Sequence, residues 1–302
     1  MEQLELYTYE KEPREGLYIK DTCKYAKVEE IRQLAQICNN HDHIKMELPL
    51  NIPLLLDRPS GEYNSFLYYK KSILVGFLGM FSFVKEDEVE LTGMVHPSFR
   101  MQGIFTMMFE AAKKECLKRG TVKIFGVNDH FSESGKRWIK AAGGTLSFSE
   151  ASLELRPDSI QRPYLPSPIQ LISPGEDDME ILKEIFMASF GDLEDHAFQL
   201  IRRNIKGPEH SLFLAMHGKE AVGTITATQE IDSITLTAFA VHPNYQRKGY
   251  GRQILLLMVE MLIKQGQKNI RIEAETTNTH ALKLYENCGF VIDSCFDYYQ
   301  LR

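Results

Sequence analysis

The sequence predicts an α/β protein built from two tandem copies of one fold, each a mixed, mostly antiparallel sheet flanked by helices. A chain of 302 residues is long enough for two domains that each bury a core. The segment VHPSFRMQGIF at Val95 recurs as VHPNYQRKGYG at Val241, an offset of 146 residues that continues to the end of the chain. In both halves, apolar residues follow strand and helical periods in the same order.

A proline-rich segment separates the two copies. Its prolines are Pro157, Pro163, Pro166 and Pro168. Such a segment can continue neither a helix nor an inner strand. The sequence therefore predicts a first domain over residues 1–156, a linker over 157–168 and a second domain over 169–302.

The second copy is predicted to begin with helices and a meander of strands. Residues 173–176 have the S-x-x-E spacing of a capping box, with proline at the first helical position, which predicts a helix to about residue 190. A weaker helical pattern covers residues 193–205. Three strands of an antiparallel meander follow, over residues 212–216, 221–228 and 234–241. The last is apolar on both faces, which predicts a place inside the sheet.

The remaining elements alternate between helix and strand. A helix over residues 250–265, a strand over 269–275, a helix over 279–287 and a strand ending at residue 301 complete the copy. In the first copy, five apolar residues at helical spacing predict the corresponding first helix: Val28, Ile31, Leu34, Ala35 and Cys38.

Composition and charge exclude several classes of function. Acidic residues outnumber basic ones by 41 to 35, so the chain as a whole would not attract nucleic acid. The five cysteines form no C-x-x-C pair, so we expect reduced thiols in the cytoplasm and no metal site. The first 16 residues are charged throughout, and Glu260 interrupts the longest apolar stretch, so no membrane segment is expected.

The segment most informative about chemistry is QRKGYGR, residues 246–252. Arg247, Lys248 and Arg252 lie at the start of a predicted helix, where the helix dipole disfavours cations unless an anion joins them. Gly249 and Gly251 let backbone N–H groups approach a phosphate closely. The pattern therefore predicts a phosphate site. A solvated surface turn is the alternative, and the G-x-G-x-x-G and P-loop patterns of nucleotide folds are absent here.

These residues resemble the GNAT family of N-acetyltransferases, whose acyl-CoA signature is [QR]-x-x-G-x-[GA] after a central strand. Gln246, Gly249 and Gly251 fit that signature. The likeness continues in Asn278 and in the segment ALKLYENCGF of residues 281–290, which is similar to the N-x-x-A-x-x-L-Y-x-x-x-G-F ending of the family.

The resemblance implies acetyl-CoA as co-substrate and a fold in which the strand ending at Val241 diverges from the strand of residues 270–274. The backbone of Phe239, Ala240 and Val241 would then bond the pantetheine arm. The pyrophosphate would lie on the loop residues Gln246, Arg247, Lys248, Gly249, Tyr250, Gly251 and Arg252. Asn278 would contact the pantetheine arm, or it would only cap the helix that follows it.

The implied reaction is direct attack of a neutral amine on the acetyl carbonyl, with the CoA thiolate as leaving group. We expect Tyr285 to donate a proton to that thiolate, because a phenol stays protonated at neutral pH. The alternative is that Tyr285 is a core residue on an apolar stripe. Glu275 is the candidate general base, with Glu230 and Glu273 also near the predicted cleft, although proton loss through water would need no base.

The first copy has lost most of these features. Phe105 stands in place of Gly251, and Arg100 is the one cation left in the loop, because Met101, Gln102 and Thr106 replace the three cations. Ser132 and Ile139 occupy the positions of Asn278 and Tyr285. We therefore expect one working site, in residues 169–302, and a first copy that serves as scaffold or contacts the acceptor. Trp138 and the histidines before Pro97 and Pro243 are expected to be structural.

The leading hypothesis is an acetyl-CoA-dependent N-acetyltransferase that acts on an amine of a small molecule or a peptide. Three alternatives remain open: a non-catalytic acyl-CoA sensor, a chain in which both copies are catalytic, and an enzyme that resembles mycothiol synthase in its tandem layout. The protein is expected to be a monomer or a homodimer.

Overall fold

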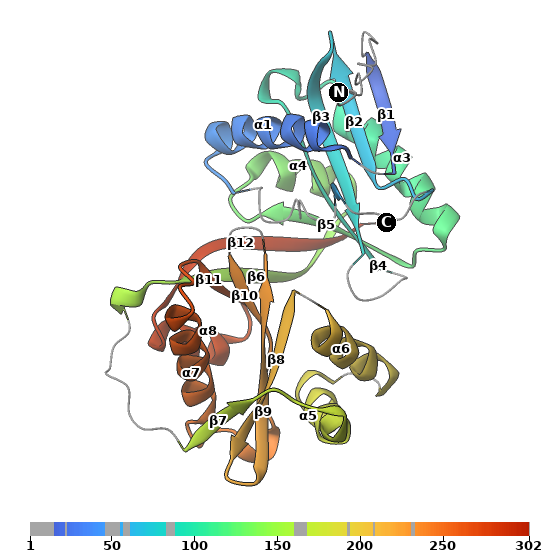
Figure 1. Ribbon diagram of the computed structural model, residues 1–302. Helices are drawn as coiled ribbons and strands as arrows, with labels where there is room; N and C mark the ends of the chain where they lie inside the picture. Colours follow the sequence, from blue (N-terminus) through green and yellow to red (C-terminus); the bar gives the residue numbers. More distant parts are fainter. Residues whose placement is uncertain are drawn as a thin grey trace, which may run out of the picture. The chain divides into compact units, whose positions relative to one another are not determined.

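The computed structural model describes residues 15–21, 23–45, 55–56, 61–82, 88–159, 168–191, 194–207, 209–230 and 233–301. The chain divides into two compact units (Figure 1). Unit 1 comprises Met1–Ser147 and Asp297–Arg302, and unit 2 comprises Phe148–Phe296. Most of the predicted linker, including Pro163 and Pro166, lies outside the described residues. None of the helices described has both the length and the apolar character that crossing a bilayer requires.

Unit 2 contains a mixed sheet whose strands follow the predicted order. Its strands are β7 (Ile169–Ile172), β8 (His210–His217), β9 (Glu220–Gln229), β10 (Ile234–Val241), β11 (Ile270–Glu275), most of β6 (Thr145–Leu155) and the first part of β12 (Phe290–Leu301). Strands β7 to β10 form an antiparallel meander, β11 joins β10 in parallel, and β6 joins β11 antiparallel. The predicted mixed sheet with a central strand β10 is confirmed.

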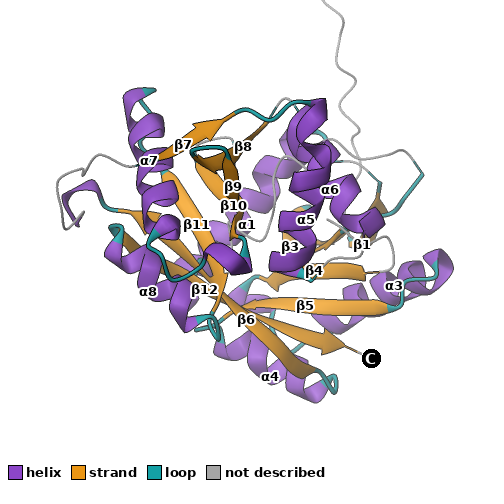
Figure 2. Cartoon of the chain, turned by 90° about the horizontal axis from the view of Figure 1, so that it is seen from below, coloured by secondary structure: helices purple, strands orange, loops and turns teal. Residues whose placement is uncertain are grey.

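Two pairs of helices cover the two faces of this sheet (Figures 1 and 2). Helices α7 (Tyr250–Lys264) and α8 (Thr279–Asn287) pack on the face that presents Ile225, Leu236 and Ile272. Helices α5 (Met179–Phe190) and α6 (Glu194–Lys206) pack on the other face, against Leu212, Leu214 and Ala240. Burial of these apolar faces is the main stabilising contribution to the unit.

The start of α5 corrects the sequence prediction. The helix begins at Met179, because residues 176–178 form a separate 3-10 turn. The backbone N–H of Gly175 donates to the Asp178 carboxylate at 2.8 Å, so the cap involves Gly175 and Asp178 and not the predicted S-x-x-E pair. Gly191 ends the helix, as predicted.

Within its described residues, unit 1 repeats this order of elements apart from a counterpart of α6. These are β1 (Gly16–Lys20), α1 (Tyr25–Asp42), β2 (Ser65–Lys70), β3 (Ile73–Phe81), β4 (Glu88–Val95), α3 (Ile104–Arg119), β5 (Lys123–Asp129) and α4 (Glu133–Ala141). The five apolar residues that predicted the first helix are all buried in α1. Helix α1 packs on one face of the sheet and α3 on the other.

The two compact units do not end where the predicted domains end. The predicted domain boundaries, at residues 156 and 169, remain a prediction. Residues 148–155 of β6 belong to unit 2, and residues 297–301 of β12 belong to unit 1. Strand β6 is held in unit 2 by ladder pairs with β11 that run from Arg271↔Glu154 to Glu275↔Glu150. A cut at residue 156 would therefore remove a core strand from the second unit.

Both units contain two parallel strands that diverge at equivalent positions. Pairing of β10 with β11 ends at Leu236↔Ile272, and pairing of β4 with β5 ends at Leu91↔Gly126. Beyond these pairs the strands continue without a ladder between them, which leaves backbone groups of β10 and β4 open to a ligand. The divergence that the resemblance implied is thus present in both copies.

A β-bulge distinguishes the two copies. Between Thr237 and Ala240 the ladder of β10 with β9 shifts, and Ala238 has a φ of 45°. Strand β4 pairs with β3 from Glu90 to Val95 without any such shift. A bulge inserts an extra residue and turns the following backbone, and bulges are common beside active sites.

Candidate functional site

The loop before α7 has the conformation of an anion-binding turn. After β10, His242 accepts a hydrogen bond from the backbone N–H of Asn244 at 3.3 Å and begins a short 3-10 turn. The Gln246 side chain donates to the carbonyl oxygen of Val241 at 3.0 Å. Arg247 and Gly249 then have φ values of 59° and 81°, so the chain reverses sharply into α7. Such a left-handed conformation suits glycine at the helix N-cap.

The donors of this turn are not used by the protein. Within the described residues, the backbone N–H groups of residues 247–252 donate to no protein acceptor, and Arg247, Lys248 and Arg252 form no ion pair with a carboxylate. Lys248 donates to the carbonyl oxygen of Asn244 at 3.0 Å and lies 5.0 Å from the centre of the Tyr245 ring. Free N–H groups at a helix N-terminus, surrounded by cations, favour a bound phosphate.

Gly251 places the start of α7 against the ends of β10 and α8. A Cβ atom built on Gly251 would lie 3.3 Å from Leu284, 3.5 Å from Val241 and 3.8 Å from Phe239. The structure therefore brings together the predicted residues of the strand end, the loop and the last helix. A larger side chain at position 251 would fill the space where the backbone is accessible.

The side chain of Tyr285 is buried beside the strand end, the loop and the last helix. Its side chain is 6% exposed, and its ring centre lies 6.1 Å from that of Phe239 and 6.4 Å from that of Phe290. Its hydroxyl forms no hydrogen bond within the described part of the chain. Burial raises the pKa of Tyr285 to about 12, so the phenol keeps its proton at neutral pH. Tyr285 is therefore packed like a core residue, and its hydroxyl is also available as a proton donor.

Asn278 caps α8, which is one of its two predicted roles. Its side-chain oxygen accepts a hydrogen bond from the backbone N–H of Ala281 at 3.1 Å. A contact with the pantetheine arm remains a prediction.

The candidate carboxylates do not converge on Tyr285. Glu230 accepts hydrogen bonds from Ser233 at 2.9 Å and Thr235 at 2.7 Å, so it stabilises its own turn. Glu275 is exposed at the end of β11 and accepts from Thr277 at 3.3 Å. No hydrogen bond joins either carboxylate to Tyr285 among the described residues.

The sequence analysis missed a polar row on the sheet face opposite α7. His210, at the start of β8, is 3.0 Å from the Thr228 hydroxyl, which lies 3.1 Å from the Thr237 hydroxyl. Thr224 and Thr226 lie on the same face of β9. The alternating threonines of residues 224–228 were the available signal, but only the register of three strands brings His210 beside them.

The first copy preserves the backbone of the turn but not its charge. Met101 and Gly103 have φ values of 60° and 74°, nearly those of their counterparts Arg247 and Gly249. Arg100, however, forms two hydrogen bonds with Asp42, at 2.6 and 2.9 Å. Although burial opposes it, these bonds hold the pKa of Asp42 below its usual value. The remaining loop cation is therefore already neutralised.

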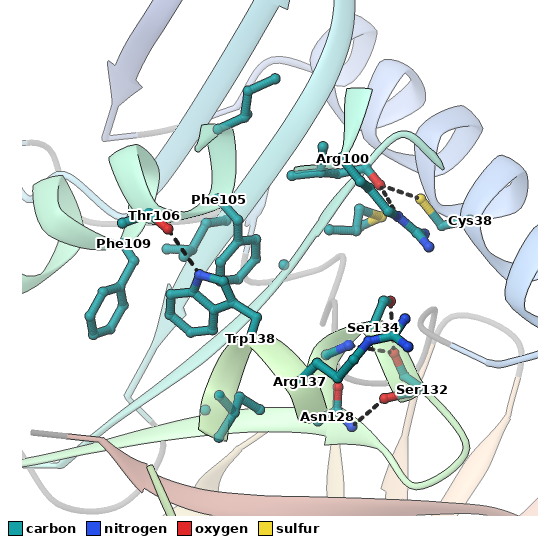
Figure 3. Close-up of a pocket in the computed structure, with 18 of the residues that line it drawn as sticks. Cys38, Arg100, Phe105, Thr106, Phe109, Asn128, Ser132, Ser134, Arg137 and Trp138 are labelled. Atoms are coloured by element: carbon teal, nitrogen blue, oxygen red, sulfur yellow. Dashed lines mark hydrogen bonds between the residues drawn. The ribbon is translucent and has the colours of Figure 1, made fainter. Parts of the chain in front are cut away.

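A cavity of about 510 Å³ lies in unit 1 beside the diverging strands (Figure 3). One wall contains Phe105 and Phe109, whose ring centres lie 4.5 and 5.0 Å from that of Trp138. The indole of Trp138 donates to Thr106 at 3.0 Å. Arg100 and Cys38 lie on the opposite wall. Trp138 is thus a packing residue as predicted, and Phe105 lines an open cavity instead of closing it.

The fold of unit 2 has counterparts among known proteins. Residues 179–290 match the model of the Acetyltransferase (GNAT) family, so this part of the chain is a GNAT acetyltransferase domain. For these residues the match confirms the family that the sequence resembles and the assignment to the acetyltransferase class.

Curated relatives carry related names. N-alpha-acetyltransferase 30 of Xenopus laevis is 28% identical over 229 residues, which cover 70% of this chain and 82% of that protein. The [ribosomal protein bS18]-alanine N-acetyltransferase of Escherichia coli K12 is 39% identical over 77 residues. That match covers 26% of this chain and about half, 51%, of the E. coli protein.

Solved structures confirm the fold over both units. A GCN5-related N-acetyltransferase from Sphaerobacter thermophilus has a TM-score of 0.78 at 15% identity, covering 94% of this chain and 95% of that one. A tandem GNAT protein from the clavulanic acid biosynthesis pathway has a TM-score of 0.68 at 13% identity, covering 94% and 97%. The tandem arrangement predicted from the repeat therefore has a solved counterpart.

Proposed function

We propose that residues 169–302 bind acetyl-CoA and transfer its acetyl group to an amine. The observation that carries this proposal is the set of N–H groups of residues 247–252 that have no acceptor in the described part of the chain. They lie at the N-terminus of α7 with three cations beside them. A diphosphate would accept hydrogen bonds from these groups and offset the charge of Arg247, Lys248 and Arg252.

The diverging strands offer a place for the pantetheine arm. Beyond Leu236 the edge of β10 that faces β11 has no ladder partner among the described strands, so the amides of the arm can bond to the backbone of Phe239, Ala240 and Val241 as an added strand would. The bulge at Ala238 turns the backbone at this edge. Gly251 keeps the approach open.

In the proposed reaction the amine nitrogen forms a bond to the acetyl carbon while the carbon–sulfur bond breaks. Tyr285 would supply a proton to the departing thiolate. The raised pKa of Tyr285 keeps its proton in place before the reaction, although it also makes the phenol a weaker acid than an ordinary tyrosine. Glu275 remains a candidate base, because its exposed carboxylate lies at the end of the strand that diverges from β10.

We propose an α-amine of a peptide or protein as the acceptor. Of the two curated relatives described above, one is named an N-alpha-acetyltransferase and the other an alanine N-acetyltransferase of ribosomal protein bS18. A small-molecule amine is the second candidate. A peptide acceptor predicts that activity depends on the first few residues of the peptide, whereas a small amine such as a polyamine would be acetylated without such dependence.

Two matched glycines test the site. Gly249 and Gly103 both have positive φ, and both face space in which a Cβ meets no atom closer than 3.9 Å. Gly249→Trp and Gly103→Trp therefore impose similar backbone strain. Calorimetry should find one equivalent of acetyl-CoA per chain, with an affinity that falls at least tenfold in Gly249→Trp and stays unchanged in Gly103→Trp. Two equivalents, or equal losses, would contradict a single site in the second copy.

Thiol release separates the enzyme from a sensor. With a panel of N-terminal peptides, polyamines and aminoglycosides, the wild-type chain should release CoA thiol with at least one acceptor. Tyr285→Phe should lower this release about a hundredfold while acetyl-CoA binding persists. Tight binding without release across the panel would instead favour a non-catalytic acyl-CoA sensor.

A further inference from the structure

A hydrogen-bonded row crosses three strands of unit 2 and begins at a carboxylate. Glu209 lies 3.4 Å from Nε2 of His210, and Nδ1 of His210 lies 3.0 Å from the Thr228 hydroxyl. The Thr228 hydroxyl lies 3.1 Å from that of Thr237. The His210 side chain is only 11% exposed, whereas that of Glu209 is 51% exposed. The row therefore connects solvent to the interior of the sheet face.

The inner end of this row lies where β10 leaves β11. Thr237 directly follows Leu236, the last residue of β10 in the parallel ladder, and directly precedes the bulge residue Ala238. The Thr224 hydroxyl donates to the carbonyl oxygen of Ala238 at 2.9 Å, which fixes the bulge from the same face. Thr237 itself is half-buried, so its hydroxyl is not sealed in the core.

This row is absent from the described residues of the first copy. In its strands the ladder pairs Ser65↔Gly79 and Gly79↔Thr92 correspond to Leu212↔Thr226 and Thr226↔Thr237 of unit 2. The same correspondence aligns three threonines of β9 with apolar residues of β3. Thr224, Thr226 and Thr228 align with Phe77, Gly79 and Phe81, and His210 aligns with Tyr63. The hydroxyl row therefore occurs in the copy that also has the cationic turn and the bulge.

We propose that His210, acting through Thr228 and Thr237, receives the proton that the acceptor amine loses during acetyl transfer. This inference rests on the proposed function and names the proton acceptor for that same site. His210 is accordingly a positioning residue that acts through two hydroxyls, and Glu209 orients its ring.

Each proton released in this step is taken up by the next group of the row. As the bond between nitrogen and carbon forms, the nitrogen gives a proton to Oγ1 of Thr237. Thr237 passes its own proton to Thr228, and Thr228 passes its proton to Nδ1 of His210. One N–H bond of the amine is broken and one N–H bond of imidazole is formed. Glu209 and solvent then take the proton from the ring.

The charged groups around the row fit this direction of transfer. Glu209 is next to the ring, and the Glu230 carboxylate on the neighbouring turn is held by Ser233 and Thr235. On α6, which packs on β8, the described cation Arg202 lies over the Phe198 ring at 5.4 Å. Arg271 and Glu273 of β11 share a face with Thr237. Of these groups, Glu209 contacts the ring directly, at the solvent end of the row.

The test compares three variants of the full chain. His210→Gln and Thr228→Val interrupt the row, while Thr226→Val is the matched control. Thr226 lies on the same strand and face, and its buried hydroxyl has no hydrogen-bond partner within the described chain. We expect His210→Gln and Thr228→Val each to lower kcat ten- to a hundredfold at pH 7 with a peptide acceptor found in the thiol-release panel. Thr226→Val should stay within twofold of wild type.

Three further measurements separate proton transfer from a structural effect. The wild-type kcat should fall as the pH drops through the range in which histidine gains a proton, about pH 6 to 7, and His210→Gln should lose that limb. The double variant of His210→Gln and Thr228→Val should have the kcat of the slower single variant, because the two residues act in series. Without acetyl-CoA, the ¹⁵N resonance of Nδ1 of His210 should shift in Thr228→Val but not in Thr226→Val.

The outcomes distinguish this inference from the proposed function. Turnover by the wild type, with unchanged kcat and pH limb in His210→Gln and Thr228→Val, would overturn the row alone and leave Glu275 or water as the proton acceptor. A wild-type chain that binds acetyl-CoA but releases no thiol with any acceptor would overturn the proposed function, and this inference with it.

Discussion

Tyr285 shows how burial changes the chemistry of one side chain. Its pKa is raised from 10.0 to about 12 because the ionised phenolate would lose its hydration in the core. In the unfolded chain the tyrosine would lose its proton near pH 10. The unfolded state therefore gives up this proton first as the pH rises. The stabilising contribution is complete below about pH 10 and is lost between about pH 10 and 12.

This difference predicts an alkaline destabilisation that depends on one residue. Two pKa units correspond to about 2 to 3 kcal/mol of the free energy of unfolding. Urea unfolding of wild type and Tyr285→Phe at pH 8 and at pH 11 should show a steeper loss in the wild type, because phenylalanine has no proton to lose. Parallel losses in the two proteins would contradict a buried phenol at position 285.

At the residue scale the sequence predicted roles that depend on local geometry. Asn278 caps a helix and His242 caps a turn because each accepts from a backbone N–H two or three residues ahead. Roles that depend on distant strands were not predictable. Glu230 is occupied by its own turn, and the link from His210 to Thr237 needs the register of three strands.

At the scale of elements, equivalent turns in the two copies fold alike while their chemistry differs. The 3-10 turn and the N-cap that lead into α3 have the same conformation as those that lead into α7. The repeated H-P and glycine positions account for this. The bulge in β10 had no signal in the sequence, because an inserted residue in one copy can be offset by a shorter turn in the same copy.

The bulge predicts that a single hydroxyl has a measurable role in the strand. Thr224 is fully buried and donates to the carbonyl oxygen of Ala238, whose positive φ is strained for a residue with a side chain. Thr224→Val leaves that oxygen without its hydrogen bond. We expect a loss of about 1 to 2 kcal/mol in the free energy of unfolding and a raised KM for acetyl-CoA.

Thr226→Val is again the matched control for this prediction. It removes a buried hydroxyl on the same strand that has no partner in the described chain, so unfolding should be unchanged or shifted to higher urea concentration. Denaturant unfolding and acetyl-CoA titration of both variants check the result. Equal destabilisation by Thr224→Val and Thr226→Val would mean that the hydrogen bond to Ala238 does not contribute to the free energy of unfolding.

At the scale of the whole molecule, the repeat predicted the tandem fold, but it could not locate the edges of the compact units. Sequence similarity aligns β6 with β12, since residue 155 maps onto residue 301. The structure instead assigns most of β6 to unit 2 and the end of β12 to unit 1. The strands with which β6 and β12 pair depend on the rest of each sheet. Because the sequences of β6 and β12 are similar, they do not indicate which unit each strand joins.

The exchange of strands predicts that two fragments of the chain will behave differently. Ala151, Leu153 and Leu155 of β6 are at most 2% exposed and belong to the same core as Ile272 and Met258. A fragment of residues 148–296 keeps this strand beside β11. A fragment of residues 157–302, cut at the proline-rich segment, loses it and exposes both the edge of β11 and part of that core.

Fragment 148–296 should therefore fold with a cooperative thermal transition and bind acetyl-CoA. Fragment 157–302 should aggregate, or melt at least 10 °C lower, because an unpaired inner strand presents free N–H and C=O groups together with apolar surface. Circular dichroism melts and size-exclusion chromatography compare the two directly. Equal stability of the fragments would mean that β11 does not need β6, and the proline-rich segment would then be a true domain boundary.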